Sequence, residues 1–142
     1  MSQFPRILVV DDNVDAASGL GRLLGLMGYD VRVVNDGPAA VAEVDRFAPQ
    51  VVLLDLGMPG MDGLETAERI RLCEHGHDLF LIAVTGWGQD KDRQRTEAAG
   101  FVAHLTKPVN FDQLETLLSR LAGGKTATST PAPMSGDRVS SA

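Results

Sequence analysis

The sequence has only one cysteine, one tryptophan and one tyrosine, and aromatic residues make up 5% of its 142 positions. The single cysteine, Cys73, cannot form an internal disulfide, which agrees with a reducing compartment. Lys and Arg number 13 against 19 Asp and Glu, and no basic stripe is visible, so we expect no nucleic-acid partner. The chain also lacks a signal-peptide hydrophobic region and any apolar run of the roughly 18 to 20 residues that span a bilayer. We therefore expect a cytoplasmic protein that binds no membrane.

The composition is that of a folded protein with one domain. Hydrophobic residues make up 44% of the chain and charged residues 23%, and 142 residues are enough to bury one core. Residues 123–142 differ from the rest, because Gly, Ser, Thr, Ala and Pro supply 15 of these 20 positions. Such a segment has little apolar surface to bury. We predict a folded domain over residues 5–122 and a disordered tail or linker stub over residues 123–142.

Short apolar runs alternate with amphipathic segments along the predicted domain. Three of the five runs are apolar enough to be buried on both faces, and all five are predicted to be strands: residues 7–10, 31–34, 51–54, 80–84 and 101–105. The segments between them predict helices: one with Leu20, Leu23, Leu24 and Met27 that ends before Gly28, one from Pro38 to before Pro49, then residues 64–72, residues 89–99, and a last helix capped by Asn110. Five such units predict an α/β fold, a doubly wound parallel sheet with helices on both faces.

Two of the predicted helices have an unusual composition. Residues 89–96 are polar on every face, so we expect the fourth helix to be weakly packed and the most mobile of the five. The first helix contains Gly19, Gly21 and Gly25, which we interpret as sites of close packing or as a source of softness. These glycines lie inside a helix, after an acidic turn, and do not fit the glycine-rich turn of a dinucleotide site. We therefore expect no nucleotide cofactor.

Polar residues stand where the predicted strands end. Asp11 and Asp12 follow the first strand, Asp55 the third, Thr85 the fourth and Lys107 the fifth. The carboxyl ends of parallel strands meet at one edge of a sheet, where open α/β sheets bind ligands. Three carboxylates at that edge repel one another and one lysine offsets only part of their charge, which favours a hard, oxygen-seeking cation such as Mg²⁺. A carboxylate beside a cation, an ammonium group and a hydroxyl is suited to accept a phosphoryl group.

The chain resembles the receiver domains of bacterial two-component systems over nearly all of residues 5–122. The resemblance rests on four motifs that stand in the family's order and spacing: ILVVDDN, VVLLDLGMPGMDGLE, LIAVTGWG and HLTKP. It implies a five-stranded parallel sheet with the flavodoxin-like strand order 2-1-3-4-5. The stretch that begins TGWGQ and ends LTKPV is most similar to receivers fused to hybrid histidine kinases.

The resemblance also implies a role for the carboxylates. Asp55 matches the phosphoacceptor, and Asp12 and Asp55 match the direct carboxylate ligands of Mg²⁺, with Mn²⁺ as an alternative ion. Asp11 matches a ligand that acts through water. The backbone carbonyl of Gly57 matches the third protein ligand.

Four further positions acquire roles in the same way. Thr85 matches the hydroxyl that binds the phosphoryl group, and Lys107 matches its ion-pair partner, followed by a cis peptide bond before Pro108. His104 stands where many members carry a Tyr or Phe that turns inward on activation. An imidazole can change rotamer there but does not supply the usual aromatic packing. The resemblance thus implies that Thr85 and His104 are switch residues.

Together these residues predict a signalling module and not an enzyme. We expect Asp55 to accept a phosphoryl group from a phosphohistidine, on a sensor histidine kinase or a histidine phosphotransfer protein, and to shift the surface around the fourth helix and fifth strand. The alternative is a metal-dependent phosphatase with an aspartyl nucleophile, but that enzyme usually has an acid two residues beyond the nucleophile, where Gly57 stands. The sequence leaves open whether the receiver acts alone or is fused to an upstream kinase domain.

Two features lie outside this scheme. Cys73, His75 and His77 offer three soft-metal ligands, but one residue separates the histidines and no fourth ligand is evident, so we favour an exposed loop over a zinc site. Trp87 fits two interpretations equally well: partial burial beside the fourth helix, or a lid or partner anchor at the mouth of the site.

Overall fold

The computed structural model describes residues 6–58, 63–86 and 93–123. Its elements in chain order are β1 (Arg6–Val10), α1 (Val14–Leu26), β2 (Asp30–Val34), α2 (Gly37–Phe47), β3 (Val51–Asp55), α3 (Gly63–Leu72), β4 (Phe80–Thr85), α4 (Arg93–Ala98), β5 (Phe101–Thr106) and α5 (Phe111–Gly123). The predicted strands are confirmed, each within one residue at either end. Trp87 and the predicted tail beyond Gly123 lie outside the described residues. In the part of the chain that is described, no helix is long and apolar enough to cross a membrane.

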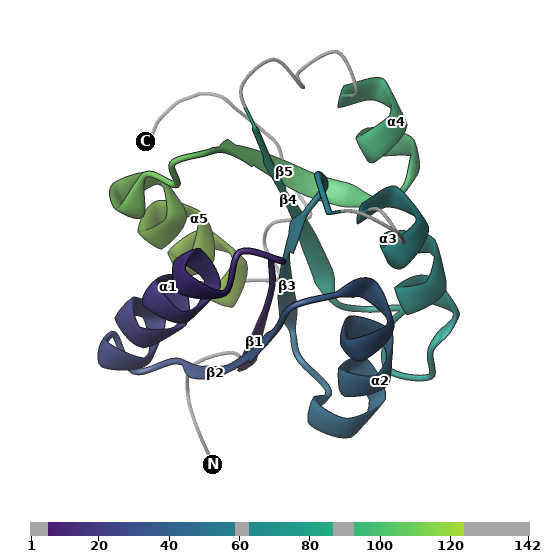
Figure 1. Ribbon diagram of the computed structural model, residues 1–142, viewed down its shortest axis with the longest axis horizontal. Helices are drawn as coiled ribbons and strands as arrows, with labels where there is room; N and C mark the ends of the chain where they lie inside the picture. Colours follow the sequence, from purple (N-terminus) through teal and green to yellow (C-terminus); the bar gives the residue numbers. More distant parts are fainter. Residues whose placement is uncertain (1–5, 59–62, 87–92, 124–142) are drawn as a thin grey trace. The chain divides into compact units, whose positions relative to one another are not determined.

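The five strands form one parallel sheet in the order β2-β1-β3-β4-β5, as Figure 1 shows. This order is the one that the family resemblance implies. Val10, the last residue of β1, pairs with Val34 of β2 and Leu54 of β3, and Thr85 at the end of β4 pairs with Thr106 of β5. The carboxyl ends of neighbouring strands are therefore aligned, and the residues that follow them reach the same edge.

Burial divides the strands into central and edge strands. All of β3 is buried, as is every residue but the first of β1 and β4. In contrast, β2 has no buried residue, and only Phe101 and Leu105 are buried in β5. The prediction of three strands covered on both faces is confirmed. The reason is their place in the sheet, because a central parallel strand is covered by crossover helices on both sides.

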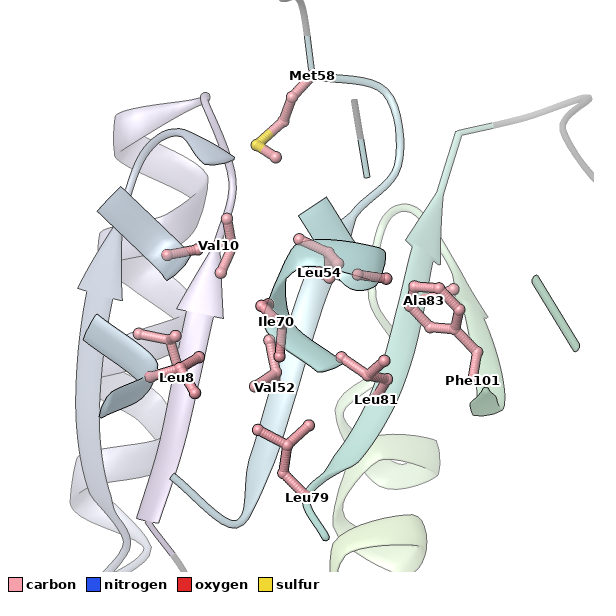
Figure 2. Packing of buried hydrophobic residues seen from close by; sticks show 13 residues of the cluster. Leu8, Val10, Val52, Leu54, Met58, Ile70, Leu79, Leu81, Ala83 and Phe101 are labelled. Carbon is pink, nitrogen blue, oxygen red and sulfur yellow. The ribbon is translucent and has the colours of Figure 1, made fainter. Parts of the chain in front are cut away.

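The core on one face of the sheet is formed by alternate residues of the three central strands. Leu8 and Val10 of β1, Val52 and Leu54 of β3, and Leu81 and Ala83 of β4 pack together with residues of α2 and α3. Figure 2 shows Ile70 of α3 among these strand residues. The helix α1 contacts β1 and β2 and lies across the sheet from α2 and α3 (Figure 1). Helices on both faces are thus confirmed.

The glycines of α1 have different surroundings. A Cβ atom on Gly21 would lie 2.7 Å from Cγ2 of Val33 in β2, so this glycine permits close packing, as predicted. Gly19 and Gly25 have nothing within 4 Å of such an atom, and for them the close-packing interpretation is wrong. They face open space, so they lower the helix propensity without any packing gain. Gly28 has a φ of 103° and follows the C-cap residue, as expected of a residue just beyond a helix.

Short polar side chains cap three of the helices. The Oδ1 atoms of Asn13, Asp36 and Asn110 each accept a hydrogen bond from a backbone N–H three residues on, at 2.8 to 3.0 Å, at the starts of α1, α2 and α5. Each bond satisfies a donor that the first helical turn leaves unpaired. The predicted cap of the last helix, Asn110, is confirmed; this helix belongs to a compact unit of its own, Asn110–Ala142.

The fourth helix is better anchored than its composition predicts. Its described part, α4, covers Arg93–Ala98, and the predicted first turn at residues 89–92 lies outside the described residues. Thr96 is fully buried. The expectation of a weakly packed helix is therefore not met at this position, because a threonine can be buried once its hydroxyl has a partner. The mobility of the helix stays a prediction.

Candidate functional site

Asp55 is the last residue of the fully buried strand β3 and is only 4% exposed. Its Oδ1 accepts a hydrogen bond from the backbone N–H of Gly57 at 2.9 Å. A buried carboxylate needs such donors, because its transfer out of water is otherwise costly. The turn after β3 therefore holds the side chain in one orientation and leaves the second oxygen, Oδ2, for another partner.

Asp11 has the same arrangement at the end of β1. It is 9% exposed, and its Oδ1 accepts a hydrogen bond from the backbone N–H of Asn13 at 2.9 Å. Asp12, the next residue, is exposed and has no hydrogen bond or ion pair within the described ranges. One carboxylate oxygen from each of Asp11, Asp12 and Asp55 can be chosen so that all three lie within 4.8 Å of one another.

Lys107, directly after β5, joins two of these carboxylates. Its Nζ lies 3.1 Å from Oδ2 of Asp55 and 3.4 Å from Oδ2 of Asp11. Its backbone N–H donates to the carbonyl of Thr85 at 2.8 Å, which continues the ladder between β4 and β5 beyond the strand end. The backbone thus brings the lysine to the acidic residues, as its place at the strand end predicts. The peptide bond to Pro108 is cis, as the resemblance implies.

The electrostatics of the site reflect an excess of negative charge. Burial raises the pKa of Asp11 and the neighbouring Asp55 raises it further, while the Asn13 N–H and the charge of Lys107 act in the opposite direction. Burial alone would lower the pKa of Lys107, but its hydrogen bond to Asp55 and the charges of Asp55 and Asp11 outweigh that effect and raise it. The ammonium group therefore stays charged, and the carboxylates still outnumber it.

The donor set fits a hard divalent cation. Three carboxylates with oxygens this close supply the ligand type that Mg²⁺ prefers, and two of them are already oriented by backbone N–H groups. One lysine leaves an uncompensated charge for a cation to balance. Gly57 is exposed, and its N–H is committed to Asp55. Its carbonyl as a ligand stays a prediction.

The two predicted switch residues lie on adjacent strands. Thr85 is 2% exposed at the end of β4, and His104 is half-buried on β5, opposite Ala83. Nε2 of His104 forms a short hydrogen bond with the hydroxyl of Thr96 in α4. The imidazole thus already has a partner in the fourth helix, which the sequence did not indicate.

Sequence reasoning missed one residue at this edge. Asn35 follows β2, and its Nδ2 donates to the backbone carbonyl of Asp11 at 2.9 Å. The sequence does carry a signal for it, because Asn35 is a polar residue directly after a strand, like Asp11, Asp55 and Lys107. An amide carries no charge, so this position does not stand out among groups that bind a cation or a phosphoryl group.

The cysteine and histidines after α3 do not gather into a site. His75 pairs with Asp45 of α2, and the thiol of Cys73 contacts the backbone carbonyls of Val41 and Arg69. Over residues 6–58, 63–86 and 93–123, the only cluster of three side chains suited to a metal ion is Asp11, Asp12 and Asp55. His75 and His77 are exposed in the loop between α3 and β4, as the loop interpretation predicts.

A groove with mostly apolar walls adjoins the acidic residues. Its volume is about 490 Å³, and its walls include Ala16, Leu20 and Leu23 of α1 as well as Asp11 and Lys107. Leu23 is 47% exposed, so part of this apolar wall is open to solvent. The site is therefore bordered on the α1 side by apolar surface.

The chain matches one protein family over most of its length. The family model described as the response regulator receiver domain matches residues 7–119. The sensor protein GacS of Pseudomonas syringae pv. syringae is 36% identical over 135 residues, which cover 93% of this chain and 15% of GacS. The chain thus matches a small part of that relative.

Solved structures agree in fold. The receiver domain of the sensor histidine kinase PA1611 from Pseudomonas aeruginosa PAO1, which holds a magnesium ion in its active site cleft, is 31% identical with a TM-score of 0.76, over 85% of this chain and 99% of that one. The chemotaxis protein CheY4 of Vibrio cholerae is 26% identical with a TM-score of 0.78, over 83% of this chain and 98% of that one. With the parallel sheet and the acidic edge, these matches show that the chain belongs to the response regulator receiver domains of two-component systems.

Proposed function

We propose that Asp55 accepts a phosphoryl group from a phosphohistidine and that the surface of α4 and β5 changes as a result. The observation that carries the proposal is the shared lysine: Nζ of Lys107 lies 3.1 Å from Asp55 and 3.4 Å from Asp11, beside a third carboxylate. A buried carboxylate with an ammonium group at one oxygen and an N–H at the other is a nucleophile held in place.

In the transfer step, an oxygen of Asp55 attacks the phosphorus atom of the donor. The P–N bond breaks, its electron pair stays on the donor imidazole, and a P–O bond to Asp55 forms. The developing charge lies on the phosphoryl oxygens, where Lys107 supplies one positive charge and the hydroxyl of Thr85 one donor. A bound Mg²⁺, held by Asp12, Asp55 and the Gly57 carbonyl and through water by Asp11, would add charge neutralisation at the same oxygens.

We propose that a protein carries the phosphohistidine, either a sensor histidine kinase or a histidine phosphotransfer protein. The apolar groove beside Asp11 and Lys107 supports this partner, since exposed apolar surface next to a reactive group favours docking of a protein surface. The partial match to GacS supports a receiver that works within a larger kinase.

The phosphorylated Asp55 should act on the fourth helix through Thr85 and His104. A phosphoryl group adds negative charge and acceptor oxygens at the end of β3, next to β4, which Thr85 ends. Because His104 is hydrogen-bonded to Thr96, any movement of this ring must break or carry the bond to α4. Both arrangements should exist before phosphorylation, which shifts their populations.

The test is labelling by acetyl phosphate and by a cognate histidine kinase in the presence of Mg²⁺. The wild-type chain should gain one phosphoryl group, detected by intact mass, and Asp55→Asn should gain none. Asp36→Asn is the matched control, because it makes the same substitution at an exposed helix cap that Asn also serves. Undiminished labelling of Asp55→Asn would overturn the proposal.

The same two proteins, the wild-type chain and Asp55→Asn, also test the alternative that the chain is a phosphatase. The family and relatives give no support to the phosphatase alternative. We expect no Mg²⁺-dependent hydrolysis of an external phosphate ester such as p-nitrophenyl phosphate above the level of Asp55→Asn. Multiple-turnover hydrolysis that depends on Asp55 would contradict a purely signalling role.

A further inference from the structure

Asn35 links the end of β2 to the acidic turn after β1. Its Nδ2 donates to the carbonyl oxygen of Asp11 at 2.9 Å, and the N–H of Asp11 donates to the carbonyl of Val34 at 3.2 Å. The two strands are neighbours in the sheet (Figure 1). The backbone of Asp11 is therefore held on both sides by two consecutive residues of the β2 segment.

This bond is not needed to start the helix that follows. Asp36, the next residue, caps α2 by accepting a hydrogen bond from the N–H of Ala39 at 2.8 Å. The amide of Asn35 takes no part in that cap. The amide instead donates to a residue 24 positions earlier, at the proposed cation site.

The consequence falls on Asp12. The carbonyl of Asp11 and the N–H of Asp12 share one planar peptide group, so a fixed carbonyl fixes the direction in which the chain enters Asp12. On the other side, the N–H of Asn13 is bound to Oδ1 of Asp11. Asp12 itself has no side-chain partner within the described residues, so its backbone alone sets where its Cβ atom lies and which rotamers can bring the carboxylate to the site.

We propose that Asn35 is a positioning residue of the cation site, which acts through the Asp11–Asp12 peptide and keeps the backbone of Asp12 where its carboxylate can reach the oxygens of Asp11 and Asp55. The inference rests on the proposed function, in which Asp12 is a ligand. A ligand whose backbone is in place before the cation arrives has less freedom to lose on binding, so the cation binds more tightly. Residues that orient ligands in this way typically change metal affinity by about 10- to 100-fold.

The experiment compares Mg²⁺ binding by the full chain, Asn35→Ala and Gln50→Ala. Gln50 is the matched control: its side-chain amide accepts a hydrogen bond from the backbone N–H of Arg6 at 3.0 Å, at the opposite end of the same strand β1. Asn35→Ala loses one neutral amide hydrogen bond to the residue just after β1, and Gln50→Ala loses one to the first residue of β1. Neither variant changes the net charge. Dissociation constants are measured by calorimetry, and independently from the rise in melting temperature with Mg²⁺.

Asn35→Ala should raise the Mg²⁺ dissociation constant about 10-fold, whereas Gln50→Ala should leave it within about twofold of the wild type. Labelling by acetyl phosphate should distinguish Asn35→Ala from Gln50→Ala in the same way. For Asn35→Ala the Mg²⁺ concentration that gives half the maximal rate should rise, while the rate at saturating Mg²⁺ stays within about twofold, because Asp55 and Lys107 are untouched.

Three outcomes would overturn the inference: an unchanged dissociation constant in Asn35→Ala, an equal loss in Gln50→Ala, or a saturating rate that falls as far as the affinity. The last two would indicate a general loss of structure. If the wild-type chain itself bound no Mg²⁺, the proposed function would fail instead, and that result is distinct from any difference between the variants.

Discussion

The three carboxylates of the site are not equivalent at the scale of single residues. Asp11 and Asp55 each use one oxygen to accept a backbone N–H two residues on and direct the other toward Lys107. Asp12 has neither contact and is exposed. Charge repulsion in the metal-free protein should therefore be concentrated at the buried carboxylates, where water screens it least.

Asp11→Asn should raise the free energy of unfolding of the metal-free protein at neutral pH. Burial and Asp55 raise the pKa of Asp11 above its ordinary value of 3.8, so the ionised form is less favourable in the folded than in the unfolded chain. The protonated group favours folding below pH 3.8, and this contribution is lost as the pH rises through the folded-state pKa. Urea unfolding without Mg²⁺, at neutral pH and below pH 3.8, checks the prediction.

The advantage of Asp11→Asn over the wild type should shrink at the acidic pH, where the native Asp11 is itself neutral. Asp12→Asn is the companion variant, and its effect on metal-free stability should be smaller because Asp12 is exposed. A neutral-pH stability of Asp11→Asn below that of the wild type would show that the contact with Lys107 outweighs the burial of the charge.

Among the elements, α1 and α4 pack differently from what their composition suggests, and they do so in opposite ways. The apolar spacing of α1 suggests an ordinary packed helix, yet two of its glycines face open space. The polar α4 suggests a loose helix, yet its Thr96 is buried and bonded to His104 of β5. Stability within each helix thus depends on a few positions and not on the average residue.

Replacing the glycines of α1 one at a time should distinguish the effect of close packing against β2 from the effect of helix propensity. Gly19→Ala and Gly25→Ala should each raise the free energy of unfolding by about 0.5 to 1 kcal/mol, because Ala is the better helix former and the added Cβ meets nothing. Gly21→Ala should lower it, because its Cβ would lie 2.7 Å from Val33. Chemical denaturation of the three single variants measures this. Equal effects at all three positions would contradict the packing assigned to α1.

The contact between α4 and β5 gives a prediction for switching. A beryllium fluoride mimic of the phosphoryl group should change amide exchange most between residues 85 and 106, and Thr85→Ala should abolish that response. Thr96→Val keeps the shape of the side chain but removes the hydroxyl that binds His104. In this variant the amides of α4 should exchange faster before the mimic is added, because the helix has lost one of its anchors.

Two results would contradict this coupling. One is an intact response in Thr85→Ala. The other is a response concentrated on α1 and α2. These helices contact β1 and β2, which lie on the opposite side of β3 from β5. Either result would leave the phosphorylation site itself in place, since the labelling of Asp55 is measured separately.

At the scale of the whole molecule, the receiver fold accounts for most of the chain. The family model covers residues 7–119, and the last described helix ends at Gly123, one residue beyond the predicted domain boundary. Residues 124–142 contain few apolar side chains. We propose that they contribute nothing to the stability of the receiver.

Removal of residues 124–142 should leave both stability and labelling nearly unchanged. The expected change in the free energy of unfolding is below about 0.5 kcal/mol, the usual scale for inconsequential surface changes. Thermal melting and the rate of labelling by acetyl phosphate, compared with the full chain, provide the check. A clearly larger loss of stability would mean that the segment packs against the domain.

The order of apolar and polar residues is enough to predict the elements and the edge of the sheet at which the chemistry lies. Apolar runs specify buried parallel strands, and polar residues directly after them must meet at one edge once those strands are parallel. For this reason the sequence predicts that Asp11, Asp55 and Lys107 lie together, although the last two are 52 positions apart. The motifs then identified the family, and with it the strand order.

Contacts between side chains of different elements depend on how the folded chain packs, and the sequence pattern does not predict them. The bond from Asn35 to Asp11, the bond from Thr96 to His104 and the contact of Gly21 with β2 depend on how a helix or turn is placed against a strand that is distant in sequence. Periodicity shows which face of an element is buried, but it does not show which neighbour that face meets. Hydrogen bonds act over about 3 Å, so their partners are settled by the packing of whole elements.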